Sequence, residues 1–123
     1  MQKNLLIIDD DDDIRYALRE VFEPLGYRVF LVRVVYDIFD AIREFNPDLI
    51  LLDYQLTEGN GADICYEVKS NAGTHHIPII MLSAYPHAML ANGNYGWDNF
   101  MAKPFDITTL EKMVERYLMP KAV

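Results

Sequence analysis

Five polar residues, spread across the 123-residue chain, come at or directly after the ends of apolar runs: Asp9, Asp10, Asp53, Ser83 and Lys103. Three carboxylates, one hydroxyl and one ammonium would form a reactive set if the fold brought them together. Crowded carboxylates repel one another unless a cation lies between them, and Mg²⁺ prefers such oxygen ligands. The chemistry that this set favours is covalent transfer of a phosphoryl group to an aspartate, with Mg²⁺ and the ammonium stabilising the transferred oxygens.

Each of these aspartates has a simpler explanation when it is taken alone, because an aspartate after a strand is often only the cap of the next helix. The acidic block continues through Asp11, Asp12 and Asp13. We expect these three in the first turn of a helix, where unpaired N–H groups and the helix dipole favour acids. The evidence for chemistry is therefore the whole set of five residues and not any one of them.

The pattern of apolar residues predicts the elements that would position this set. Continuous apolar runs are typical of strands buried on both faces, and the expected strands are 5–8, 27–32, 48–53, 77–82 and 99–102. Apolar residues at helical spacing predict helices over 14–22, 35–45, 62–70 and 107–118. Residues 84–98 are broken by Pro86, Gly93 and Gly96, and the stretch NGNYGWDN at 92–99 is rich in glycine and asparagine, which argues against a regular helix there.

Strands that alternate with helices imply a parallel sheet with helices on both faces, and five such units suit an α/β doubly wound sheet. Ligands of that architecture bind outside the carboxyl ends of the strands. Since the five polar residues stand at strand ends, we expect them to converge at one edge of the sheet.

The amino-acid composition argues against several classes of function. A net charge of −8 and a pI of about 4.7 argue against nonspecific binding of nucleic acid. The single cysteine, Cys65, excludes an internal disulfide and favours a reducing compartment. No apolar run approaches the ~18 residues of a membrane span, and the N-terminus lacks the apolar stretch of a signal peptide. We therefore expect a cytoplasmic protein that does not contact membranes.

Four segments carry a resemblance to a known family: LLIIDD at 5–10, DLILLDYQLTEGNG at 48–61, IPIIMLSAY at 77–85 and FMAKPF at 100–105. In this order and at these spacings, the chain resembles a response-regulator receiver domain of bacterial two-component signalling, the CheY-like family. The resemblance implies one receiver domain over residues 1–123. It also implies a flavodoxin-like five-stranded parallel sheet of order 2-1-3-4-5 with helices on both faces.

The resemblance assigns a role to each acidic residue. Asp53 would be the phosphoacceptor. Asp9 and Asp10 would be an acid pair, with Asp10 ligating Mg²⁺ directly and Asp9 mostly through water. Asp53 itself and the backbone carbonyl of Gln55 would complete the protein ligands of the metal.

Other matched positions concern the transferred group and the response to it. Ser83 would supply a hydroxyl to a phosphoryl oxygen, and Lys103 would pair with another. Phe100 matches the aromatic residue that switches rotamer, and Gly61 matches a glycine of the loop after the phosphoacceptor. Thr57 departs from the family pattern, which usually has a proline four residues after the phosphoacceptor.

The implied function is a switch: a sensor histidine kinase or a histidine phosphotransfer protein phosphorylates Asp53, and the change of surface is read by a downstream protein target. The domain would catalyse only its own phosphorylation and dephosphorylation, so it would not be an enzyme in the usual sense. Direct nucleic-acid binding is not expected, and homodimerisation is left open.

Two alternatives remain at this stage. The first is a pseudo-receiver, an interaction module that binds a partner without being phosphorylated. The second is a phosphatase of the haloacid dehalogenase class, whose nucleophile would be Asp9 in an Asp-x-Asp arrangement with Asp11. That second hypothesis leaves Asp53 unexplained.

Overall fold

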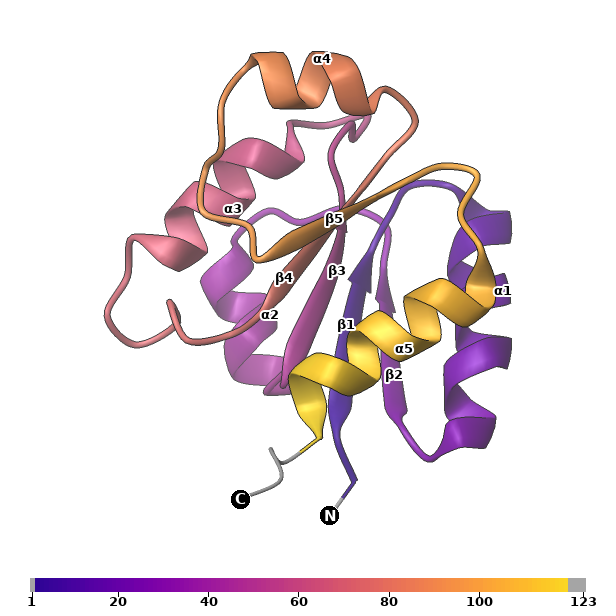
Figure 1. The fold of residues 1–123 in the computed structure, drawn as a ribbon. Coiled ribbons are helices and arrows are strands. Elements are labelled where there is room, and N and C mark those ends of the chain that lie inside the picture. The colour runs from indigo at the N-terminus through magenta and orange to yellow at the C-terminus, as the bar shows by residue number, and fades with distance from the viewer. Residues whose placement is uncertain (1, 120–123) are drawn as a thin grey trace.

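The structure is a computed structural model that describes residues 2–119. Five parallel strands form one sheet: β1 (Asn4–Ile8), β2 (Arg28–Val32), β3 (Leu49–Asp53), β4 (Ile79–Ser83) and β5 (Asn99–Ala102). Their order in the sheet is β2-β1-β3-β4-β5 (Figure 1). This confirms the predicted fold class and strand order, and it places the ends of β1, β3, β4 and β5 side by side.

A helix follows each strand: α1 (Asp12–Phe22), α2 (Ile38–Phe45), α3 (Gly61–Lys69), α4 (Pro86–Ala91) and α5 (Ile107–Leu118), with a short 3-10 helix η1 (Glu23–Leu25) after α1. Four of them begin where a side chain caps the first turn. Asp11, Asp37, Asn60 and Asp106 each accept a hydrogen bond from backbone N–H groups of that turn. These caps satisfy donors that a helix cannot pair internally, so they fix the start of each helix.

The sheet separates two hydrophobic cores. On one face, Leu5 and Ile7 of β1 pack with residues of α1 and α5. On the other face, Leu6 and Ile8 pack with residues of α2 and α3 and with Met89 of α4. Figure 1 shows this division, with α1 and α5 on one side of the sheet and α2 and α3 on the other. Because both faces are covered, the central strands are apolar at successive positions.

Two sequence predictions about helices differ from the structure. The second helix begins at Ile38 and not near Val35, because Asp37 caps it; Val35 lies before the helix and still packs against the core. Residues 84–98, where no regular helix was expected, contain the six-residue α4. Past that helix the chain turns at Gly93 and Gly96, whose positive φ angles of 94° and 105° favour glycine.

No helix within residues 2–119 is both long enough and apolar enough to cross a membrane.

Candidate functional site

Three carboxylates converge at the carboxyl edge of the sheet. Asp9 and Asp10 follow β1, Asp53 ends β3, and each offers an oxygen atom within 4.8 Å of the others'. The Asp9 side chain is fully buried and Asp53 is 5% exposed, whereas Asp10 is only half-buried. β1 and β3 are neighbours in the sheet, so the convergence follows directly from the strand order. The structure therefore brings the three predicted acidic residues together.

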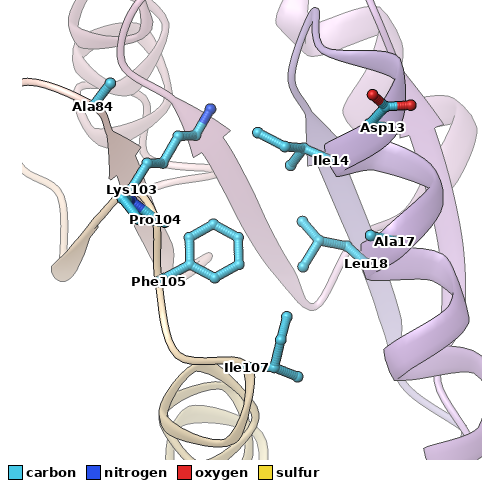
Figure 2. Close-up of a pocket in the computed structure, with 9 residues that line it drawn as sticks. All are labelled: Asp13, Ile14, Ala17, Leu18, Ala84, Lys103, Pro104, Phe105 and Ile107. Carbon is cyan, nitrogen blue, oxygen red and sulfur yellow. The ribbon is translucent and has the colours of Figure 1, made fainter.

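Lys103, the first residue after β5, reaches across this edge to the carboxylates. Its Nζ atom lies 2.7 Å from Asp9 Oδ2 and 3.5 Å from Asp53 Oδ1. The stem of Lys103 runs along an apolar pocket of about 430 Å³ between α1 and the β5–α5 connection. Figure 2 shows the Lys103 side chain extending away from Phe105 toward its ammonium end. The stem thus lies against apolar residues while the ammonium faces the acids.

Electrostatics at this edge favour a cation. Burial and, after it, the negative charge of Asp9 raise the pKa of Asp53 to about 6, although Lys103 opposes both effects. Three carboxylates and one ammonium leave two formal negative charges when all are ionised. Clustered carboxylate oxygens with that residual charge match the ligand preference of a hard divalent cation. The residues present therefore fit Mg²⁺, with Asp9, Asp10 and Asp53 as its candidate holders.

Ser83 is fully buried at the end of β4, on the strand next to Asp53. In the register of that pair Asp53 lies opposite Leu82, so Ser83 stands one residue further toward the site. Its Oγ accepts a hydrogen bond from the Tyr85 N–H at 3.0 Å. Because a hydroxyl can accept and donate at once, the Ser83 proton remains available for an oxygen placed near Asp53.

Gln55 and Gly61 bracket the loop that follows Asp53. The Gln55 N–H points to Asp53 Oδ1 at 3.3 Å, and Gln55 pairs with Asn60 in an isolated antiparallel bridge. Gly61 is the first residue of α3, and its N–H donates to Tyr54 O at 2.8 Å. A Cβ atom at this position would lie 3.0 Å from Tyr54 Cα and would overlap the Asp53 carbonyl oxygen. The close approach of α3 to β3 therefore requires a glycine at position 61. The role of the Gln55 carbonyl as a metal ligand stays a prediction.

Phe100 lies on β5, opposite Met81 of β4, and packs half-buried against the core on the α2–α3 face. It is three residues before Lys103 and packs against the core cluster that also contains Met89 of α4. This position is compatible with the switch role, which stays a prediction.

Two residues that contact the acid pair were not identified from the sequence. Arg15 of α1 is buried, and its Nη1 donates to the backbone oxygen of Asp9 at 2.8 Å. Thr57 donates to Asp10 Oδ2 from its N–H at 2.8 Å and also from its hydroxyl. The only feature of the sequence that could have indicated this contact of Arg15 is its position one turn into a helix that begins with acidic residues. Thr57 was visible only as the departure from the family pattern.

The rest of the acidic block has the structural role expected of it. Asp11 is the N-cap of α1 and accepts from Asp13 N at 2.9 Å and Ile14 N at 3.2 Å. Asp12 forms an ion pair with Arg15. The interpretation of this block as helix capping is therefore confirmed for its cap residue, and Asp12 and Asp13 occupy the first turn.

Comparisons with known proteins agree with this geometry. The family model described as the response regulator receiver domain matches residues 5–115. The polar-differentiation response regulator DivK of Brucella ovis is 28% identical over 122 residues, which cover 96% of this chain and 98% of DivK.

Solved structures are similar as well. The signal receiver domain of a signal transduction histidine kinase from Syntrophus aciditrophicus has a TM-score of 0.85 at 25% identity, covering 98% of this chain and 96% of that one. The response regulator TrrA of Thermotoga maritima, solved in complex with Mg²⁺-BeF, has a TM-score of 0.84 at 25% identity, covering 95% and 100%.

Proposed function

The chain belongs to the response regulator receiver domain family, and we propose that it is a phosphorylation-activated switch within that family. In this proposal a histidine kinase or a phosphotransfer protein donates a phosphoryl group to Asp53 in a Mg²⁺-dependent reaction. The added charge then changes the surface that a downstream protein binds. The observation that carries the proposal is the convergence of Asp9, Asp10, Asp53 and Lys103 at one sheet edge, with Ser83 on the adjoining strand.

The metal would be held by Asp9, Asp10, Asp53 and the backbone carbonyl of Gln55. Bound Mg²⁺ would supply positive charge to the carboxylates and to the phosphoryl oxygens. The TrrA structure, which holds Mg²⁺-BeF, supports this assignment by similarity.

The protein's own residues account for the rest of the transfer. An oxygen of Asp53 attacks phosphorus, so that a P–O bond forms while the bond from phosphorus to the donor nitrogen breaks. Lys103 already lies 3.5 Å from Asp53 Oδ1, close enough for its ammonium to pair with a phosphoryl oxygen attached there. The Ser83 hydroxyl, which accepts from Tyr85, has its proton free to donate to a second oxygen.

The response to phosphorylation would run from Ser83 to Phe100. If Ser83 moves toward the phosphoryl group, space opens at the end of β4, and Phe100 on the adjoining strand is the half-buried aromatic residue that can enter it. A partner that prefers this rearranged surface must also favour phosphorylation, because the two equilibria are linked. In this proposal the domain acts in the cytoplasm, touches neither membrane nor nucleic acid, and catalyses no reaction on a separate substrate.

The two alternatives differ in what they expect of the site. A pseudo-receiver usually lacks part of the acidic set, but here every reactive position is filled. A phosphatase with Asp9 as nucleophile needs a free Asp9 oxygen. Here Asp9 is fully buried, its Oδ2 pairs with Lys103, and its Oδ1 accepts from Asp11 N at 2.9 Å. Asp53 is the better nucleophile on these grounds.

Intact mass after incubation with acetyl phosphate tests the proposal. We expect wild type to gain one phosphoryl group when Mg²⁺ is present and none in chelator, and Asp53→Asn to gain none. The variant Asp13→Asn, which changes an exposed acid of the same block, should behave as wild type. An unmodified wild-type chain after rapid quenching would favour the pseudo-receiver.

A further inference from the structure

We propose that Thr57 is a positioning residue for Asp10: it holds one carboxylate oxygen and leaves the other for the metal. Two donors of Thr57, the backbone N–H and the side-chain hydroxyl, meet on Asp10 Oδ2. A proline at this position, as the family usually has, could supply neither donor. The inference rests on the proposed function, since it concerns the metal that the function requires.

Asp10 is the member of the acidic set that needs positioning. Asp9 is fully buried and held by Lys103 and the Asp11 N–H, and Asp53 is 5% exposed with Lys103 and the Gln55 N–H nearby. Asp10 is more exposed than either, and rotation toward solvent would relieve its repulsion from the other two carboxylates. The contacts with Thr57 oppose that rotation while no cation is bound.

The two hydrogen bonds from Thr57 indicate that it positions Asp10 and does not compete with the metal for it. Both donors use the same oxygen, so a cation could bind the second oxygen of Asp10 without displacing either of them.

The hydrogen bonds between Thr57 and Asp10 link the loop after β3 to the loop after β1. Thr57 lies in the loop between β3 and α3, whose ends are joined by the Gln55–Asn60 bridge and by the hydrogen bond from Gly61 N to Tyr54 O. Asp10 lies between β1 and α1. A cation that fixes Asp10 should therefore also order the loop around Thr57, because binding and loop order are linked.

Calorimetric titration with MgCl₂ at constant ionic strength tests the proposal. Thr57→Val keeps the N–H and the shape but loses the hydroxyl, and we expect roughly two- to tenfold weaker Mg²⁺ binding, the cost of ordering one freed side chain on binding. Thr57→Ser restores the hydroxyl and should bind as wild type does. Thr57 is exposed, so both variants should fold; Thr108→Val, on the exposed surface of α5, controls for loss of a threonine hydroxyl elsewhere.

Hydrogen exchange at the Thr57 amide gives a second readout. If Thr57 keeps its hold on Asp10 in the metal-bound state, Mg²⁺ should leave this amide as protected as before or more so. Loss of protection on adding Mg²⁺, or tighter Mg²⁺ binding by Thr57→Val, would show that Thr57 competes with the metal and would overturn the proposal. Equal affinity of Thr57→Val and wild type would overturn it too.

Failure of this inference can be told apart from failure of the proposed function. If wild type binds Mg²⁺ but the Thr57 variants do not differ, only the role of Thr57 is wrong. If wild type binds no Mg²⁺ at millimolar concentration, the metal-dependent switch itself is wrong, and the inference is wrong with it.

Discussion

At Asp53 two requirements oppose each other. A phosphoacceptor must be ionised to attack phosphorus, yet Asp53 is 5% exposed and shares its site with the buried carboxylate of Asp9. Its pKa is accordingly raised, to about 6, and Lys103 keeps it from rising further. Near pH 7 the residue is therefore mostly ionised, at a cost to stability that a bound cation would relieve.

Asp53→Asn is expected to stabilise the protein in chelator above pH 6. Between the ordinary pKa of 3.8 and the raised value of about 6, the folded protein holds the Asp53 proton more tightly than the unfolded chain does. The contribution of Asp53 to stability therefore falls as pH rises through that range and stays low above it. Removing the ionisable group should recover up to about 3 kcal/mol at pH 7.

Urea unfolding of both proteins from pH 4 to pH 8 in chelator measures this difference directly. The variant and the wild type should differ least at pH 4, because Asp53 is protonated there in the folded wild type and partly protonated in its unfolded chain. A stability difference that stays constant over the whole range would contradict the assignment of the raised pKa to Asp53.

Among the elements, the five strands could be predicted well from the sequence. The apolar runs marked all five strands, because each is covered by helices or neighbouring strands and needs no polar alternation. The helices that follow β3 and β5 begin close to their predicted starts, at the caps Asn60 and Asp106. Convergence of the acids at one sheet edge was expected from the parallel architecture, whereas the strand order that makes β1 and β3 neighbours came from the resemblance.

The remaining features depend on contacts between distant segments. Val35 continues an apolar stripe, so the sequence pattern extended the second helix to it, but the Asp37 cap sets the start at Ile38. The helix α4 is short and begins at a proline, and its one fully buried residue is Met89. A single buried residue cannot produce the helical spacing of apolar residues from which a helix is predicted. The contact of Thr57 with Asp10 spans 47 positions in the chain, and no local pattern encodes it.

Gly61→Ala tests how closely α3 must approach β3. The added Cβ would overlap the Asp53 carbonyl oxygen and lie 3.0 Å from Tyr54 Cα, both of which are backbone atoms that cannot rotate away. We expect a loss of about 1–3 kcal/mol in the free energy of unfolding, the usual cost of overpacking. Phosphorylation by acetyl phosphate should slow as well, because Asp53 is displaced.

Gly73→Ala is the matched control for that variant. The nearest atom to a Cβ at Gly73 is a side-chain oxygen of Asn71 at 3.3 Å, on an exposed turn, and stability should change by no more than about 0.5 kcal/mol. Equal effects of the two substitutions would contradict the close approach of α3 and β3.

For the whole molecule, the acidic edge joins elements that are far apart in the chain. Asp9 and Asp10 follow β1, Asp53 ends β3, and Lys103 follows β5. A cation bound by these acidic residues would therefore stabilise the folded state, because the unfolded chain lacks the binding site. The excess of negative charge, −8 overall, adds to the attraction.

We expect Mg²⁺ to raise the free energy of unfolding, by about 1.4 kcal/mol at a concentration tenfold above its dissociation constant. Chemical denaturation with Mg²⁺ and with chelator measures the effect. Asp10→Asn should lose most of it, whereas Asp63→Asn, an exposed acid in the first turn of α3, should keep it. An equal gain in both variants would mean that the ion acts away from the acidic edge.

The identity of the phosphorylated residue tests the proposed receiver mechanism most directly. Reduction of an aspartyl phosphate with borohydride converts that aspartate to homoserine, which peptide mass analysis can place in the chain. After phosphorylation in Mg²⁺, we expect homoserine at position 53 and at no other aspartate, and none when the metal is removed. Homoserine at position 9 would instead identify the phosphatase-type nucleophile and contradict the receiver mechanism proposed for this site.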